Sequence, residues 1–320
     1  MIAKECLPPV RIHQYEALDP RLDPSHPIRP TLLTEYNNWM AGYKGEKSLI
    51  FYLSMLPEEK YHIFHNLRLQ LGSYFFQIDI LLLCTAFGLV VEVKNRTGEY
   101  FFQKYLNQTT LKNQRISNPV LQARVQALKL NMWLQKYHLP AFPIHYLFVN
   151  SNEKATIKIE HGNEQILRYI CNSEGLIEKI TQTANFNKKE ILVQKDLRKI
   201  KRLLLTNHTP DILDILNHFN LMEHEILPGV FCPRCDHLPI TYIYGTWNCP
   251  ECGCKSKTAH IPAVNDHFLL IKPTITNSEL RQFLHISSPR VANYLLQNMD
   301  LTATGEYKSR IYTPNHSLWV

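Results

Sequence analysis

Two acidic residues flank the longest apolar run of this chain, and a lysine follows the second one. Asp79 directly precedes the run, Glu92 directly follows it, and Lys94 comes two residues later. Strand alternation places Glu92 and Lys94 on one face, and the short connection at residues 85–88 favours a hairpin that brings Asp79 near Glu92. Two close carboxylates raise each other's pKa unless a cation lies between them. Mg²⁺ suits such a pair, because it binds carboxylate oxygens and keeps several waters.

Glu46 is a third candidate ligand. It lies in the same helical stripe as Leu49, Ile50 and Leu53, so its carboxylate should point inward. An unpaired inward charge is costly, and a metal held by Asp79 and Glu92 would compensate it. The alternative is that Lys94 is a strand-end lysine and only forms a salt bridge with Glu92.

The elements that must position these residues can be read from the hydrophobic pattern. Residues 31–56 look helical, with a break near residues 42–45, and residues 119–137 form a helix capped by Asn118. Leu121, Val125, Leu128 and Met132 are its expected apolar stripe. Strand-like runs lie at residues 61–69, 75–83, 88–95, 98–106 and 144–150. This order predicts an α/β fold, a mixed central sheet flanked by helices.

Composition divides the rest of the chain. Residues 1–30 contain six prolines and are expected to form an extended N-terminal arm. We expect the sheet domain at residues 31–160 and a helical, basic connector at residues 161–225. Two small modules are expected to follow, at residues 226–262 and 263–320.

The net charge of +7 is unevenly distributed. Residues 94–136 carry eight Lys/Arg against one acid, and residues 188–202 form a second basic cluster. Each cluster alone is compatible with a solvated helix face, but together they favour a polyanionic partner, most commonly nucleic acid. The N-terminus has no apolar signal segment, and the longest apolar run is about half a membrane span, so we expect a cytoplasmic protein without a membrane partner.

Five of the eight cysteines lie at residues 232–254, which indicates metal binding instead of a disulfide framework. The two CxxC pairs can supply four thiolates to a structural Zn²⁺, as in a zinc ribbon; Cys254, His237 and His260 are alternative ligands. The preferred ligands are Cys232, Cys235, Cys249 and Cys252.

Residues 276–314 follow the order helix, turn, helix, hairpin, which resembles a winged helix-turn-helix. Its second helix would present Arg290, Asn293 and Tyr294 to DNA. The alternative is a small packing or dimerisation domain that gives a homo-oligomer or binds a protein partner.

Four short motifs occur in the order typical of one family: GE at residues 45–46, QIDILLL at 77–83, GLVVEVKNRTG at 88–98 and NPVLQ at 118–122. Together they resemble the nuclease-related domain, NERD, a branch of the PD-(D/E)xK nuclease superfamily, over roughly residues 40–150. The chain departs from the superfamily pattern in one place, because Ile78 precedes Asp79 where proline is usual.

The resemblance implies a restriction-endonuclease-like core that binds Mg²⁺ or Mn²⁺ through Asp79 and Glu92. The expected activity is hydrolysis of DNA, in preference to RNA, with Lys94 and Gln122 acting on water or phosphate and Glu46 as a further ligand. The DNA backbone would contact Arg96, Lys112, Arg115 and Arg124. The alternative function is a non-catalytic nucleic-acid-binding or regulatory protein with a nuclease-like fold.

Overall fold

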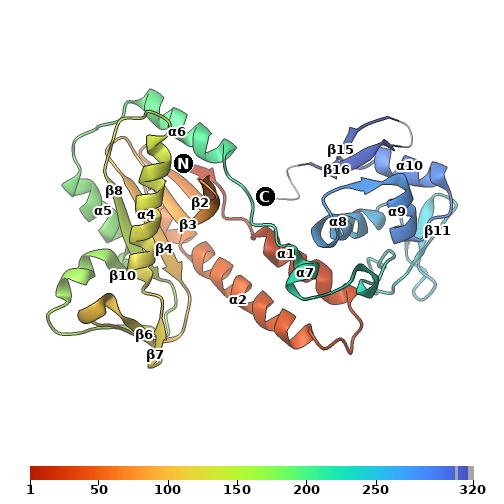
Figure 1. The fold of residues 1–320 in the computed structure, drawn as a ribbon, viewed down its shortest axis with the longest axis horizontal. Helices are drawn as coiled ribbons and strands as arrows, with labels where there is room; N and C mark the ends of the chain where they lie inside the picture. Colours follow the sequence, from red (N-terminus) through yellow and green to blue (C-terminus); the bar gives the residue numbers. More distant parts are fainter. Residues whose placement is uncertain (307–308, 316–320) are drawn as a thin grey trace. The chain divides into compact units, whose positions relative to one another are not determined.

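The computed structural model describes residues 1–306 and 309–315 and divides the chain into two compact units (Figure 1). Unit 1 comprises Met1–Leu7 and Asn38–Pro210, and unit 2 comprises Pro8–Asn37 and Asp211–Val320. These units group the chain differently from the segments expected above, because residues 161–210 pack with unit 1 and residues 211–225 with unit 2. Helix α2 (Arg29–Ser48) contributes residues to both units.

Unit 1 is built on a six-stranded sheet with the order β1-β2-β3-β4-β8-β10. The β2-β3 and β3-β4 pairs are antiparallel, whereas β1-β2, β4-β8 and β8-β10 are parallel. The predicted mixed sheet is therefore confirmed, and the two strands that carry the acids lie at its centre. The strands are β1 (Ile2–Lys4), β2 (His62–Leu71), β3 (Tyr74–Leu83), β4 (Gly88–Lys94), β8 (Ile144–Asn150) and β10 (Ile170–Asn172).

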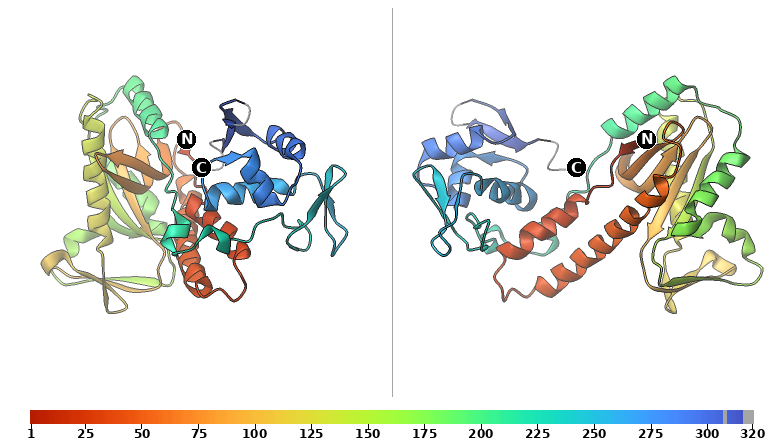
Figure 2. Two further views of the ribbon diagram at one scale, coloured as in Figure 1. Left: turned by 45° about the vertical axis from the view of Figure 1, so that its right-hand side comes forward. Right: turned by 180° about the vertical axis from the view of Figure 1, so that it is seen from behind.

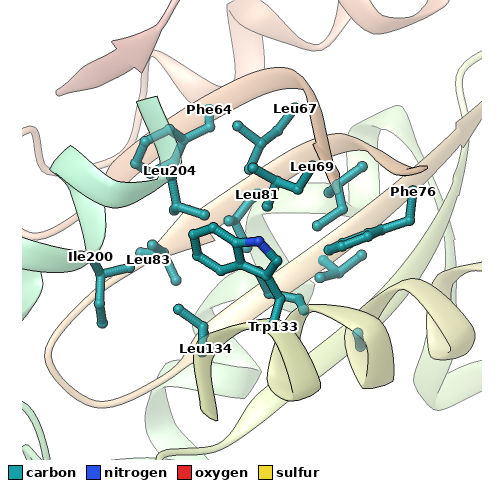
Figure 3. Close-up of a cluster of buried hydrophobic side chains, with 14 of the residues drawn as sticks. Phe64, Leu67, Leu69, Phe76, Leu81, Leu83, Trp133, Leu134, Ile200 and Leu204 are labelled. Carbon is teal, nitrogen blue, oxygen red and sulfur yellow. The ribbon is translucent and has the colours of Figure 1, made fainter. Parts of the chain in front are cut away.

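Helices cover both faces of this sheet. On one face, α4 (Pro119–Gln135) and α6 (Gln194–Thr206) bury Trp133, Leu134 and Ile200 against β2 and β3 (Figure 3). On the opposite face, α3 (Ile50–Leu53) and α5 (Leu176–Phe186) cover the other side chains of the same strands (Figure 2, right). Strands covered on both faces need continuous apolar sequence, which explains the long run between Asp79 and Glu92.

The apolar stripe predicted for α4 is wrong. Val125, Leu128 and Met132 are 44%, 55% and 53% exposed. The helix instead buries a neighbouring stripe that includes Ala123, Ala127, Leu130 and Leu134. Two stripes of similar apolar content compete on this helix, and the alanines let its backbone approach the sheet closely while Trp133 fills the remaining space.

Helix α2 continues through Gly42 and Gly45, so the predicted break is absent. Gly45 is required for a close approach: a Cβ atom there would lie 2.6 Å from Asn95 Cβ and 2.7 Å from Ser151 Oγ. Because glycine removes this obstacle, the end of α2 reaches the carboxyl ends of β4 and β8 and brings Glu46 with it.

A second, four-stranded sheet in unit 1 has the order β7-β6-β5-β9. Gly98 begins its first strand with φ +116°, and a Cβ atom there would lie 2.6 Å from the Lys112 side chain. The strands are β5 (Gly98–Phe102), β6 (Thr109–Leu111), β7 (Gln114–Ile116) and β9 (Ala155–Ile159); short 3-10 turns lie at Tyr105–Asn107, Glu164–Tyr169 and Ser173–Gly175.

Unit 2 begins with a helix where an extended arm was expected. Residues 10–18 form α1 (Val10–Leu18), and Pro9 precedes its first turn, where a missing N–H costs nothing. After the 3-10 turn Asp19–Arg21, the fully buried Arg21 donates from Nε to Asp266 at 2.8 Å. Asp266 lies on α8 (His260–Leu270), so the proline-rich segment is part of the core of unit 2. The shorter elements α7 (Ile215–His218) and Glu223–Glu225 complete this region.

A three-stranded sheet of order β11-β12-β13 carries the cysteine motifs. Tyr244 and Gly245 both have positive φ and form the two-residue turn of its hairpin. Trp247 is 1% exposed and packs in one core with α8, α9 and α10. The strands are β11 (Thr241–Ile243), β12 (Thr246–Asn248) and β13 (Lys255–Ser256).

The C-terminal elements follow the order strand, helix, helix, hairpin. A capping box between Thr276 and Glu279 starts α9 (Asn277–Leu284), and Ser288 caps α10 (Pro289–Gln297). The strands β14 (Ile275–Thr276), β15 (Leu301–Thr304) and β16 (Ile311–Pro314) pair in the order β14-β16-β15. Residues 307, 308 and 316–320 of the expected module lie outside the described residues. The winged-helix assignment stays a prediction.

Within the part of the chain that the structure describes, no helix combines the length and the apolar character needed to cross a membrane.

Candidate functional sites

The β3–β4 hairpin brings Asp79 and Glu92 together. The register runs from Leu83↔Gly88 to Ile80↔Val91, and one further step places Asp79 opposite Glu92. Asp79 Oδ2 accepts a hydrogen bond of 2.8 Å from the Val93 N–H. The cross-strand approach predicted from the short connection is therefore present.

A local irregularity on the other side of β3 accompanies this site. The β2–β3 pairing includes His65↔Ile80 and Leu67↔Ile78 but is interrupted at Asn66, which has φ +48°. Asn66 lies opposite Asp79, and its side-chain oxygen accepts a hydrogen bond of 2.8 Å from Gln77 Nε2. At Asp79 the pairing with β2 is interrupted and the pairing with β4 ends. Its side chain is only half-buried, although β3 is a central strand.

The electrostatics of the acids favour a cation. Burial, and next the charge of Glu92, raise the pKa of Asp79 to about 7 despite the opposing effects of Lys94 and the Val93 N–H. Burial also raises the pKa of Glu46 well above its usual range, and the charges of Asp79 and Glu92 add to the effect. Neighbouring carboxylates whose charges oppose one another's ionisation fit the preference of Mg²⁺ or Mn²⁺ for oxygen ligands.

Glu92 has a close partner in this structure. It is 7% exposed, and its Oε1 accepts a hydrogen bond of 2.5 Å from Lys94 Nζ. The salt bridge between Glu92 and Lys94 that the alternative interpretation predicted is thus present. It is compatible with a site for a cation, because the lysine side chain remains 27% exposed and can turn away.

The structure adds a neighbour that sequence reasoning missed. Lys4 on β1 pairs with Phe64 of β2, and burial lowers the pKa of Lys4 while the charges of Cys6 and Glu46 oppose that shift. Burial raises the pKa of Cys6 to about 12, and the charge of Glu46 adds to it. The first residues of the chain therefore bring a second ammonium group near Glu46. No local motif indicates this, because it depends on a parallel pairing across about sixty residues.

Gln122 lies in the first turns of α4 and is half-buried. Its Oε1 atom and that of Gln126, one turn later, are both buried and have no hydrogen-bond partner among the described residues. Along α4, both residues lie between Val120 and Ala127. Val120 belongs to the same buried cluster as Phe148, and Ala127 belongs to the core over β2 and β3. Phe148 is the β8 neighbour of Glu92, so the two amides stand on the part of α4 that covers this side of the sheet.

The predicted backbone-binding residues are all exposed in unit 1. Arg96 follows β4, Lys112 lies in the β6–β7 turn against Gly98, and Arg115 lies on β7. Arg124 is on the outer side of α4. Lys112 and Arg115 thus belong to the small second sheet, and Arg96 lies in the segment that leads into it. That sheet begins at Gly98, four residues after Lys94.

One family model matches this part of the chain. Residues 41–151 match the family model of the nuclease-related domain, NERD. The matched segment holds the three acids, Lys94 and Gln122, and lies within the domain expected from the sequence. A search of curated proteins and a search of solved structures each found no match.

The NERD segment is extended in unit 1 by elements outside the match. Strand β1 supplies Lys4, β10 adds the last strand of the sheet, and α5 and α6 cover its faces. The exposed side of α6 carries Lys195, Arg198, Lys199 and Arg202, so the second basic cluster belongs to the same unit as the acids.

The cysteines of unit 2 form a separate candidate metal site. The four Sγ atoms of Cys232, Cys235, Cys249 and Cys252 lie within 4.8 Å of one another. The Cys232–Cys252 and Cys235–Cys249 distances are both 3.6 Å. Ligands bound at about 2.3 Å to a tetrahedral Zn²⁺ lie about 3.8 Å apart, so the thiols fit this ion. Among the described residues, no other group of three or more His, Cys, Asp or Glu ligand atoms is gathered this closely.

Local backbone contacts shape this site. The Arg234 N–H donates to Cys232 Sγ at 3.4 Å, and the Cys249 N–H donates to the Cys254 carbonyl at 2.9 Å. The alternative ligands considered above are not in the cluster, and His260 instead accepts from Trp247 Nε1 at 3.2 Å. The cluster is consistent with a zinc ribbon.

The predicted DNA-reading face of α10 is partly engaged within unit 2. Arg290 and Tyr294 are exposed, but the Asn293 side-chain oxygen accepts a hydrogen bond of 3.3 Å from the Tyr312 hydroxyl. Asn293 therefore fixes α10 to β16 in this structure. Its role in binding DNA stays a prediction.

Proposed function

We propose that this chain is a metal-dependent nuclease that hydrolyses phosphodiester bonds of DNA, in DNA processing or in defence against foreign DNA. The observation that carries the proposal is the pairing of Asp79 with Glu92 at a break in the central sheet, next to Lys94 and inside the NERD match. Unpaired acids in a buried strand would destabilise the fold. Acids with such perturbed pKa values are typical of functional sites.

In this proposal, Asp79 and Glu92, with Glu46, hold Mg²⁺ or Mn²⁺. The bound ion would supply positive charge to the scissile phosphate and lower the pKa of a water. The ammonium group of Lys94 orients the attacking water or stabilises charge on the phosphate oxygens. Gln122 positions water or phosphate through its amide.

The exposed basic residues of unit 1 would bind the nucleic-acid backbone. Each phosphate contact by a lysine or arginine releases condensed counterions, so affinity should fall steeply with salt. The predicted contacts are Arg96, Lys112, Arg115 and Arg124. The zinc ribbon and the C-terminal helices, with Arg290 and Asn293, would target the enzyme. Reduced thiols for Zn²⁺ are available in a cytoplasm, where we propose that the protein acts.

A cleavage assay tests the proposal. Wild type, Asp79→Ala and Lys94→Ala are incubated with Mg²⁺ or Mn²⁺ and linear, circular or single-stranded DNA, with RNA in parallel. We expect both substitutions to reduce the cleavage rate by at least about 10²-fold while binding survives. Glu99→Ala, an exposed acid on β5, is the matched control and should cleave normally. Intact DNA in every reaction, with binding retained, would instead support the non-catalytic nucleic-acid-binding alternative.

A further inference from the structure

A polar pocket lies at the carboxyl ends of β8 and β10 in unit 1. Its volume is about 270 Å³, and we call it the amide pocket. The carboxyl ends of neighbouring parallel strands are a common place for ligands in open α/β sheets. Its lining includes Phe51, Tyr52, Asn150, Asn152, Asn172 and Glu174.

The amide pocket begins where the proposed catalytic site ends. The Ser151 N–H, in its lining, donates to the Lys94 carbonyl at 3.0 Å. Asn152 Nδ2 donates to Asn95 Oδ1 at 2.7 Å, and Asn95 directly follows Lys94. The pocket therefore borders the end of the strand that carries Glu92 and Lys94.

Hydrogen bonds make the polar wall of the pocket rigid. Asn150 is 2% exposed, and its Nδ2 donates at 3.0 Å both to the Asn152 carbonyl and to Asn172 Oδ1. Among the described residues, Asn172 Nδ2 donates to none, and its side chain is exposed. The wall thus offers a fixed amide donor next to the carboxylates of Glu153 and Glu174.

An aromatic side chain forms a second part of the pocket wall. Phe51 is 65% exposed, although large apolar side chains are usually buried, and it packs edge to face on Tyr52 at 5.4 Å between ring centroids. The exposed part of this ring is available for stacking.

The charges of the lining select among nucleic-acid groups. The pocket contains two glutamates and neither lysine nor arginine among the described residues, so a phosphate would be repelled. A planar, uncharged group that has amino donors and amide acceptors fits both walls. A nucleobase has these properties, and aromatic stacking of bases is typical of single-strand binding sites.

We propose that the amide pocket binds an unpaired nucleobase next to the scissile phosphate. The proposal rests on the proposed nuclease function and names its substrate class: single-stranded DNA, or DNA with a locally unpaired nucleotide. A base inside a duplex is stacked and paired and cannot enter such a pocket without being extruded.

Fluorescence of 2-aminopurine in an oligonucleotide tests this inference without cleavage. The zinc-loaded protein is titrated, with no Mg²⁺ or Mn²⁺ added, into a single strand carrying one 2-aminopurine and into the matching duplex. We expect quenching in the single strand, because the base stacks on Phe51. Phe51→Ala should remove the quenching and weaken single-strand binding roughly 5- to 100-fold. Phe51→Trp should restore both.

The control is Phe186→Ala, which removes an 85% exposed aromatic ring on α5 outside the pocket and should change nothing. Quenching that is absent, or that persists in Phe51→Ala, would overturn the inference. If Asp79-dependent cleavage is nevertheless observed, only the pocket assignment falls. If quenching depends on Phe51 but no nucleic acid is cut, the pocket assignment stands and the nuclease proposal fails.

Discussion

The cysteine site of unit 2 draws its ligands from two short turns, whereas the carboxylate site of unit 1 draws Glu46, Asp79 and Glu92 from a helix and two strands. The four thiols already lie at the spacing of a tetrahedral ion, and Cys232 and Cys249 are buried in the core of their unit. Glu46 and Asp79 remain partly exposed, and Glu92 pairs with Lys94. A closed ligand set suits an ion that holds a fold, and an open one suits an ion that must meet a substrate.

This contrast teaches that losing a ligand side chain should affect stability in opposite ways at the two sites. The thiols are part of a hydrophobic cluster with Trp247, so losing a bound zinc ion would open that cluster. The acids are a source of strain in unit 1, since their charges repel one another. Neutralising one of them should stabilise the fold and abolish activity, a trade-off common at active sites.

The largest expected effect is the loss of zinc. Cys249→Ser should remove the ion and destabilise unit 2 by several kcal/mol, because metal binding supplies folding energy in small metal-bound modules. Elemental analysis would measure zinc per chain, and hydrogen exchange would show faster exchange in residues 230–300. Cys171→Ser is the matched control, because Cys171 lies on β10 in unit 1. A Cys249→Ser protein with full zinc content would contradict this assignment.

The next effect concerns pH and the acids. Burial and the charge of Glu92 raise the pKa of Asp79 from 3.8 to about 7, so the folded state holds more protons than the unfolded chain between these pH values. Stability of the protein without Mg²⁺ should therefore fall as pH rises from about 4 to about 7. Over this pH range the Asp79→Asn protein should lose less stability than wild type, by up to about 4 kcal/mol. One pKa unit corresponds to about 1.4 kcal/mol. Urea unfolding at pH 5 and pH 8 measures the difference, with Glu99→Gln as control. A less stable Asp79→Asn protein at pH 8 would refute the strain argument.

The residues show which features a sequence can reveal. The hairpin of Asp79 and Glu92 and the CxxC turns are set by neighbours close in sequence, and both are present. The buried side of α4 was mispredicted because two stripes satisfy the same helical period. The burial of Arg21 against Asp266 depends on a partner about 245 residues away, which no local pattern encodes.

The surroundings of the acids illustrate the same limit. Gly45 is recognisable in the sequence, but its contact with Asn95 and Ser151 appears only when three elements meet. The interruption at Asn66 follows from strand pairing and has no composition signal. The motif residues were therefore predictable, whereas the residues that tune their charge were not.

The smallest expected effect comes from Lys4, which tests whether the second ammonium group near the acids only balances charge. Lys4 and Glu46 shift each other's pKa, so the lysine competes with a cation for the negative charge of the site. Lys4→Met should lower the Mg²⁺ concentration for half-maximal cleavage several-fold at pH 8, with the rate at saturating Mg²⁺ unchanged within about twofold. Lys44→Met, an exposed lysine of α2, is the control and should leave the Mg²⁺ requirement unaltered. If Lys4→Met instead abolishes cleavage at saturating Mg²⁺, as Lys94→Ala is expected to do, then Lys4 contacts the substrate. The carboxylate site would then extend beyond the NERD match to the first strand of the chain.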